Sequence, residues 1–277
     1  MIESENLWLA FGLTLFAGLS TGIGSTLAFF AQPTNKKFLS AVLGFSAGVM
    51  LYVSFIEVFP VAQEILQEEL GTSKGTLYTV IGFFAGIFII ALIDRMIPYA
   101  ENPHELKNTE EMLRPLPQGE NKDIINKKYL ARMGMFTALA IAIHNFPEGI
   151  VTFFSTLQDP ALGISLAIAI AIHNIPEGIA ISVPIYYATG SRSKAFLYSF
   201  LSGLAEPAGA LAFYFFLMPF FNEVVFGMVF SAVGGVMVFI SLDELLPAAQ
   251  KYGAHHHSIY GLILGMLVMA VSLLIII

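Results

Sequence analysis

Long apolar segments limit the folds open to this chain more than any other feature. Eight stretches are mainly apolar over about 20 residues or more, the length that an α-helix needs to cross the ~30 Å hydrocarbon core of a bilayer. In lipid, only helices and closed barrels satisfy their own backbone hydrogen bonds, and segments of this length are typical of helices. We therefore expect an all-α membrane protein, one domain over residues 1–277, with helices at 7–31, 38–66, 76–97, 129–157, 161–187, 195–220, 224–249 and 257–277.

The charge content supports this prediction. Only 12% of the residues are charged, whereas a soluble domain has about 25%, so most of the surface is expected to face lipid. The net charge of -7 and the absence of a basic stripe exclude nucleic acid as a partner. The chain has no cysteine, so any metal site must use nitrogen and oxygen ligands.

Basic residues indicate the orientation in the membrane. The one long polar segment, 98–128, is rich in Pro, Asn, Glu and Lys and is predicted to be a loop between helices 3 and 4. All Lys and Arg residues except Lys74 lie in or beside the loops on the same side of the membrane as this segment. The positive-inside rule places these loops in the cytoplasm and both termini outside.

Internal repeats organise the predicted helices. The segment 139–150 (LAIAIHNFPEGI) nearly repeats at 168–179 (IAIAIHNIPEGI), in helices 4 and 5. A weaker match relates Met50–Gln63 of helix 2 to Met237–Gln250 of helix 7, and helices 1 and 6 share the pattern G-L-x-x-x-x-G. Partners five helices apart cross the membrane in opposite directions. Helices 1–3 and 6–8 are therefore predicted to be inverted repeats around a central pair, helices 4 and 5, an arrangement typical of secondary transporters.

The duplicated motif is the clearest indication of chemistry. In each copy a histidine and a glutamate are four residues apart, so both lie on one face of a helix near the middle of the bilayer. Ionisable residues at that depth are costly and usually functional. A short turn joins helices 4 and 5, so they are antiparallel neighbours whose motif faces should converge. The predicted ligands are His144, Asn145, Glu148, His173, Asn174 and Glu177, with Glu206 of helix 6 at the same depth.

Imidazole, amide and carboxylate groups together suit a divalent cation. Imidazole favours Zn²⁺, and the carboxylates also admit Fe²⁺, Mn²⁺, Co²⁺ or Cd²⁺. Three carboxylates around one or two such cations would be close to charge-neutral. The cation is then a transported substrate and not a cofactor. The alternative is that these residues form buried ion pairs or hydrogen bonds that only hold the helices together.

The motifs HNFPEG and HNIPEG on consecutive helices, followed by AEP in the next helix and DELLP in helix 7, resemble those of the ZIP (Zrt/Irt-like) family of divalent metal transporters, in particular its bacterial ZupT-type members. This resemblance extends over nearly the whole chain. It implies a transporter of the bacterial cytoplasmic membrane that moves zinc, often with iron, manganese, cobalt or cadmium, toward the cytoplasm. It also implies that Glu206 completes a second cation position beside the first, with Glu148 and Glu177 bridging the two. Many relatives have a histidine-rich loop between helices 3 and 4, but this loop contains only His104, so a metal-sensing role is not expected for it.

Other polar residues are weaker candidates. Glu57 lies toward the outer end of helix 2 and Glu244 toward the inner end of helix 7, at matching positions of the inverted repeat. With Asp243, they either mark the mouths of the pathway or form hydrogen bonds at helix ends. A histidine cluster before helix 8 is interpreted as a solvated cytoplasmic linker in preference to a metal-exit site, and it comprises His255, His256 and His257.

Three functions are compatible with these residues. The favoured one is a carrier, not an enzyme, driven by ion gradients or membrane potential, since no GxxxxGK[ST] nucleotide motif is present. Clustered carboxylates tend to hold protons that a cation must displace, so uptake is expected to fall as pH drops. The rivals are a passive cation channel and an intramembrane zinc-dependent hydrolase, although H-x-x-x-E differs from the HExxH pattern of metalloproteases. The sequence does not distinguish a monomer from a homodimer.

Overall fold

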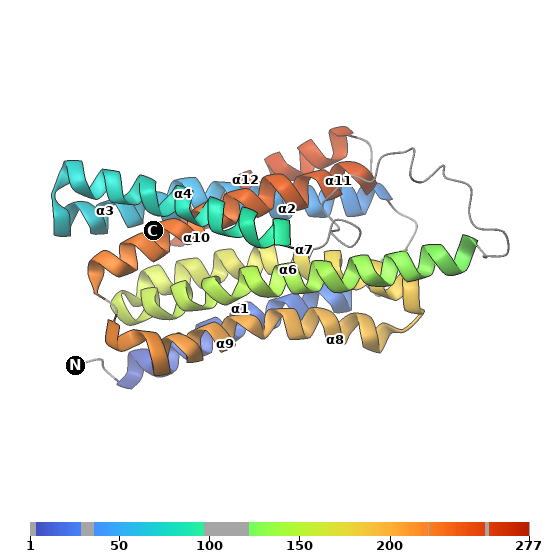
Figure 1. The fold of residues 1–277 in the computed structure, drawn as a ribbon, viewed down its shortest axis with the longest axis horizontal. Coiled ribbons are helices and arrows are strands. Elements are labelled where there is room, and N and C mark those ends of the chain that lie inside the picture. Colours follow the sequence, from blue (N-terminus) through green and yellow to red (C-terminus); the bar gives the residue numbers. More distant parts are fainter. Residues whose placement is uncertain (1–3, 29–35, 97–121, 221, 253–254, 277) are drawn as a thin grey trace.

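The computed structural model describes residues 4–28, 36–96, 122–220, 222–252 and 255–276, and every regular element within these ranges is helical (Figure 1). The prediction of an all-α protein is therefore confirmed for the part of the chain that is described. The α-helices are α1 (Ser4–Ala28), α2 (Lys36–Val53), α3 (Phe59–Leu70), α4 (Thr72–Met96), α6 (Lys122–Gln158), α7 (Pro160–Thr189), α8 (Arg192–Gly203), α9 (Ala205–Ala212), α10 (Glu223–Ile240), α11 (Leu246–Tyr252) and α12 (His255–Ile276). Short π or 3₁₀ turns connect some of them and are η1 (Ser54–Val58), η2 (Phe213–Leu217), η3 (Met218–Phe220) and η4 (Ser241–Leu245).

Seven helical spans within the described residues are long and apolar enough to cross a membrane. Each corresponds to one of the eight predicted helices. The remaining predicted helix, 129–157, lies inside α6, which is 37 residues long. The seven spans are Asn6–Thr26, Ser40–Leu70, Thr72–Met96, Pro160–Val183, Arg192–Phe216, Glu223–Gln250 and His256–Leu274.

Helix boundaries differ from the predictions at two polar segments. Most of the predicted loop 98–128 lies outside the described residues, but its last part, from Lys122, already belongs to α6. The histidine cluster was predicted to be a linker, whereas α12 begins at His255 and includes it. His256 is exposed and its ring stacks on that of Tyr260, with ring centroids 6.1 Å apart.

Two long spans contain a π turn at matching places. In η1 the Phe59 amide donates to the carbonyl of Ser54, five residues back, and in η4 the amide of Leu246 donates to the carbonyl of Ser241 in the same way. Both serine hydroxyls also donate to the carbonyl four residues back, each at 2.7 Å. A proline, which has no N–H group, follows each turn. The local sequence therefore favours a change of helical register at these points.

The helices pack in two groups (Figure 1). In the first group, α1 packs on α7 and α8, while α6 packs on α7 and α9. In the second group, α2 packs on α12, and α4 packs on α3 and α10. The two groups meet mainly where α2 contacts α7. The α6–α7 pair therefore lies in the first group with one side against the second.

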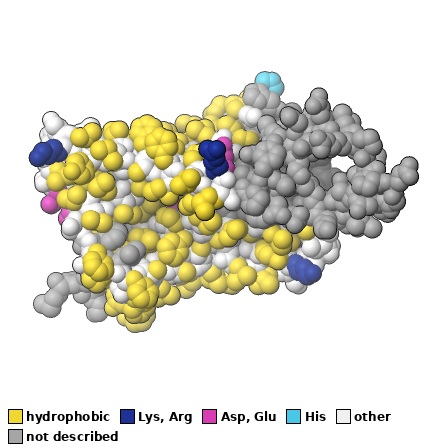
Figure 2. Space-filling view, in the orientation of Figure 1, with side chains coloured by type: hydrophobic (Ala, Val, Ile, Leu, Met, Phe, Trp, Pro, Cys, Tyr) yellow, Lys and Arg dark blue, Asp and Glu magenta, His cyan; other side chains and the backbone are white. Residues whose placement is uncertain are grey.

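Apolar side chains cover the outside of the helices. Figure 2 shows hydrophobic residues over the middle of the visible face, with charged side chains toward the ends of the described helices. On α4, Phe84, Phe88 and Leu92 are all at least half exposed. A water-facing surface would not retain so many large exposed apolar residues, whereas lipid solvates them. The chain is thus an integral membrane protein.

Candidate metal centre

A tight turn between α6 and α7 sets the two motif copies side by side. The side chain of Asp159 caps α7 by accepting a hydrogen bond from the amide of Ala161 at 2.8 Å, and Pro160 occupies the first helical position. Both features favour the start of a new helix directly after the end of the previous one. The two helices therefore run antiparallel, and each motif histidine faces the other helix.

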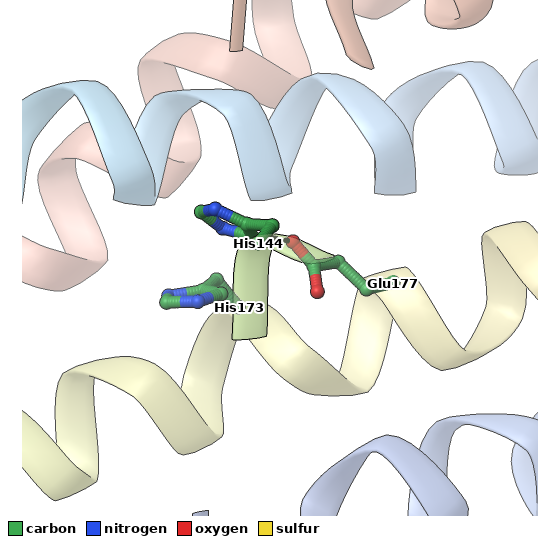
Figure 3. Close-up of side chains that lie close together, drawn as sticks. All are labelled: His144, His173 and Glu177. Atoms are coloured by element: carbon green, nitrogen blue, oxygen red, sulfur yellow. Dashed lines mark ion pairs between the residues drawn. The ribbon is translucent and has the colours of Figure 1, made fainter. Parts of the chain in front are cut away.

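Two histidines and two glutamates meet between α6 and α7. Nε2 of His144 lies 3.2 Å from Oε1 of Glu148 and 3.9 Å from Oε1 of Glu177. Nε2 of His173 lies 3.3 Å from the same oxygen of Glu148. Figure 3 shows the two imidazoles close together with the Glu177 carboxylate turned toward them. All four side chains are at most 1% exposed, so the predicted convergence of the motif residues is seen in the structure.

The asparagines of the motif point to the neighbouring helices. Nδ2 of Asn145 donates to the carbonyl of Ser202 on α8 at 3.3 Å. Nδ2 of Asn174 donates to the carbonyl of Ala17 on α1 at 2.9 Å and also to Oε1 of Glu206 on α9. The third predicted carboxylate is therefore joined to the motif through Asn174.

Most ligand atoms of this cluster have no hydrogen-bond partner. Besides the contacts between Oε1 of Glu148 and the Nε2 atoms of the two histidines, these atoms are Nδ1 of each histidine, Oε2 of Glu148, both carboxylate oxygens of Glu177, the amide oxygens of the two asparagines, and Oε2 of Glu206. An unsatisfied buried polar group costs about 1–3 kcal/mol, so a purely structural ion-pair cluster would be expected to satisfy more of them. Converging nitrogen and oxygen atoms of this kind, several of them without a hydrogen-bond partner, fit a divalent cation. One atom each from His144, His173 and Glu177 lie within 4.8 Å of one another and could hold a metal ion.

The three weaker candidates, Glu57, Asp243 and Glu244, differ in their burial and in their relation to this centre. Glu57 is half-buried in η1. Glu244 in η4 is 7% exposed and interacts electrostatically with His144 and with Glu177. Asp243, beside it, is half-buried. Glu244 therefore belongs to the surroundings of the centre, which its position near one end of helix 7 did not indicate.

Two kinds of contact made by the centre were not predicted from the sequence. The hydroxyl of Ser46 on α2 donates to the carbonyl of His173 at 3.4 Å, across the boundary between the helix groups. The backbone carbonyls of Ala17 and Ser202 orient the asparagines. The only sequence signal for the second contact was the G-L-x-x-x-x-G pattern, because Ala17 and Ser202 each precede its first glycine.

Fold and centre together define a polytopic helical membrane protein with a buried cluster of nitrogen and oxygen atoms that could hold a metal ion. The chain belongs to the ZIP family, since the family model described as ZIP Zinc transporter matches residues 5–94 and 99–273. The resemblance inferred from the motifs is thereby confirmed.

Several relatives are similar over almost their entire length. A protein named Zinc transporter ZupT from Streptococcus mutans serotype c is 61% identical over 271 residues, which cover 98% of each chain. The Zinc transporter ZupT of Clostridium perfringens is 61% identical over 275 residues, 98% of this chain and 96% of the relative. That of Chlorobaculum parvum is 60% identical over 271 residues, 98% of each chain. These are names of transporters and not of enzymes, so the comparisons do not favour the hydrolase.

Proposed function

We propose that this protein is a secondary transporter that moves Zn²⁺ across the membrane into the cytoplasm. The observation on which this rests is the buried cluster between α6 and α7, where two imidazoles and two carboxylates converge and several of their nitrogen and oxygen atoms have no hydrogen-bond partner. The description of the family and the names of relatives about 60% identical support zinc as the cargo. The same donor set also suits Fe²⁺, Mn²⁺, Co²⁺ and Cd²⁺, which we include as further substrates.

The cation is held by the motif residues and, in a second position, by Glu206. His144, His173 and Glu177 are close enough together to bind one ion, and Oε1 of Glu148 is near both imidazoles. The hydrogen bond from Asn174 to Glu206 supports an adjacent second position that shares Glu148 and Glu177 with the first. The proposed ligands are thus His144, Asn145, Glu148, His173, Asn174, Glu177 and Glu206.

The transport domain has eight membrane helices: the seven apolar spans and α6, which is helix 4 in chain order. At 37 residues α6 is longer than the ~20 that a span requires. It packs against α7 and α9, and each of these lies in one of the seven apolar spans. A helix in this position, next to two membrane helices and contributing half of the buried cluster, has to cross the bilayer with them.

Matched contacts support an inverted repeat of helices 1–3 and 6–8. Gly48 and Gly235 occupy equivalent positions in helices 2 and 7, and a Cβ atom at either would collide with a backbone carbonyl. For Gly48 this is the carbonyl of Leu262 in helix 8, and for Gly235 it is that of Phe83 in helix 3. Helices 8 and 3 are themselves predicted repeat partners. A chance similarity of apolar sequence would not reproduce such paired contacts.

The central helices contact both halves in the same symmetrical way. Asn145 donates to the carbonyl of Ser202 in helix 6, and Asn174 donates to that of Ala17 in helix 1. Ser202 and Ala17 are equivalent in the match between helices 1 and 6. The two π turns, η1 and η4, are likewise at equivalent positions. We infer a pseudo-two-fold axis through the centre between α6 and α7.

The protein lies in the cytoplasmic membrane with both termini outside. The distribution of Lys and Arg supports this orientation. Glu57 then lies on the outer side of the path, and Asp243 and Glu244 lie on the inner side. The electrostatic interaction of Glu244 with Glu177 supports a role next to the centre, where a leaving cation would first meet another carboxylate.

Zinc flux into proteoliposomes tests the proposal. The unchanged protein should give saturable zinc uptake, and Glu177→Gln should abolish this uptake because a ligand is lost from the centre. Glu64→Gln on the exposed face of α3 is a matched control that removes a carboxylate elsewhere and should leave uptake unchanged. Absence of flux from folded protein that still binds zinc would refute transport, and linear uptake without saturation would indicate a channel.

A further inference from the structure

Thr21 of α1 has a buried hydroxyl that its own helix leaves without a partner. Its side chain is 0% exposed, and its Oγ1 atom makes no hydrogen bond. Three other buried threonines, Thr14, Thr79 and Thr156, donate to the carbonyl four residues back, at 2.7–2.8 Å, whereas Thr152, like Thr21, does not. For Thr21 this acceptor would be the carbonyl of Ala17.

The carbonyl of Ala17 is already occupied. It accepts from Oγ of Ser20 at 2.6 Å and from Nδ2 of Asn174 at 2.9 Å. Because Asn174 belongs to the metal centre, the centre itself takes the acceptor that Thr21 would otherwise use. A buried hydroxyl left in this way is costly, so a further partner would stabilise it.

Thr21 lies against the part of α7 that contains Glu177. A Cβ atom on Gly178, the residue after Glu177, would collide with the carbonyl of Thr21. The hydroxyl of Ser199 donates to that carbonyl at 3.3 Å and to the carbonyl of Gly178 at 3.4 Å, which holds α1, α7 and α8 together at this point. Ala17, one turn before Thr21 on α1, accepts a hydrogen bond from Asn174. Thr21 itself packs against Gly178, the residue after Glu177. Thr21 is therefore near two residues of the centre.

The repeat makes Thr21 the counterpart of Glu206. Thr21 comes three residues after Gly18, and Glu206 comes three residues after Gly203. Gly178 packs against the carbonyl of Thr21 just as the equivalent Gly149 packs against the carbonyl of Glu206. The inferred pseudo-two-fold axis therefore predicts that position 21 faces the centre from the opposite side, with its Oγ1 atom beside Gly203 of α8.

We propose that Thr21 is a further residue of the cation site, whose hydroxyl oxygen contacts the cation or a water bound to it from the side opposite Glu206. This inference rests on the proposed function, because it assigns a residue to the same site. A neutral oxygen here adds a ligand without adding a fourth negative charge to the three carboxylates. On one side of the axis, Nδ2 of Asn174 donates to Oε1 of Glu206. On the side of Thr21, Oδ1 of Asn145 and Oγ1 of Thr21 both lack hydrogen-bond partners.

Zinc binding to the full-length protein in lipid nanodiscs tests the assignment. Isothermal titration compares the unchanged chain with Thr21→Val, which replaces the hydroxyl by a methyl group of similar size, and with Thr21→Ser, which keeps the hydroxyl. Thr21→Val should bind zinc about five- to ten-fold more weakly, the usual effect of losing one buried hydrogen-bonding group, and Thr21→Ser should remain within about two-fold. Thr14→Val is the matched control on the same helix, since Thr14 is equally buried but its hydroxyl already has an acceptor.

The outcomes distinguish a failure of the Thr21 assignment from a failure of the proposed function. Unchanged zinc affinity in Thr21→Val, with normal binding by the unchanged chain, overturns the assignment of Thr21 alone. An equal loss in Thr21→Ser, or in Thr14→Val, also overturns it, because the effect would then not depend on this hydroxyl. If the unchanged chain binds no zinc, the proposed function itself is refuted. Should Thr21→Val unfold at a lower temperature without zinc, Thr21→Ala is compared with Thr21→Ser in its place, under the same criteria.

Discussion

Replacing Gly178 with alanine tests whether close packing of α1 on α7 positions the metal centre. The added Cβ atom would lie 2.9 Å from the carbonyl carbon of Thr21 and 3.1 Å from the amide nitrogen of Ser25, and closer still to the Thr21 oxygen. Carbon atoms in ordinary contact are ~3.5–4.0 Å apart. The obstructing atoms are backbone, so α1 has to move away as a unit by a distance on the order of 1 Å.

Such overpacking usually costs about 1–3 kcal/mol of stability. At about 2–4 °C per kcal/mol for a chain of this size, the Tm should fall by about 2–12 °C. The shift would also separate Asn174 from the carbonyl of Ala17, a hydrogen bond of 2.9 Å that orients a proposed ligand. Loss of such orienting contacts typically weakens metal binding about 10–100-fold, so zinc affinity should fall by at least about ten-fold.

The assay combines thermal unfolding and zinc titration of the purified protein in nanodiscs. Gly12→Ala is the control, because Gly12 lies on α1, the helix against which Gly178 packs, and no atom beyond its own helical turn is within 4 Å of its added Cβ. That variant should keep both Tm and zinc affinity. If Gly178→Ala behaves like Gly12→Ala, the close approach of α1 and α7 does not position the centre, and the reasoning is refuted.

Three further outcomes are expected from the same centre. Glu148→Gln should abolish zinc uptake in proteoliposomes, because Oε1 of Glu148 is 3.2 Å from the Nε2 atom of His144 and 3.3 Å from that of His173; uptake equal to that of Glu64→Gln would contradict this. Apparent zinc affinity, measured by titration between pH 7.5 and 5.5, should decrease as pH falls, since protons compete with the cation for imidazole and carboxylate. Zinc uptake into proteoliposomes should fall over the same range, and uptake that rises steadily with acidity would indicate proton symport. Zinc at about 100 times its Kd should stabilise the folded protein by about 2.7 kcal/mol, seen as a higher Tm that a chelator reverses; an unchanged Tm would show that zinc does not bind the folded state selectively.

The convergence of the duplicated motif could be predicted because it depends on local rules. A spacing of four residues places His144 and Glu148 on one face of a helix, and the turn at Asp159 requires antiparallel neighbours. Both rules act over short stretches of sequence, and tertiary contacts do not override them. The structure accordingly brings the two motif copies together.

The contacts between distant helices could not be predicted in this way. Nothing near Ser46 indicates that its hydroxyl reaches the carbonyl of His173, because the partner is set by how two helix groups pack. The π turns were also missed, since hydropathy treats the segment around Ser54 and that around Ser241 as continuous helix. The available signal was a serine in an apolar helix with a proline six residues later, as in Ser54 and Pro60. The beginning of α6 at Lys122 was missed because its first residues are polar, and polarity alone favoured a loop.

The charge of the centre links its symmetry to its function. Glu148, Glu177 and Glu206 would together place three negative charges in a region that is at most 1% exposed, and an uncompensated charge at this depth costs several kcal/mol. On the proposed function, the metal-free centre holds protons that a bound dication replaces, so that both states stay near neutrality. An exact two-fold repeat would have added a fourth carboxylate at position 21 and increased this imbalance. Threonine at that position keeps an oxygen where the repeat requires one and leaves the charge at a level that one or two dications can balance.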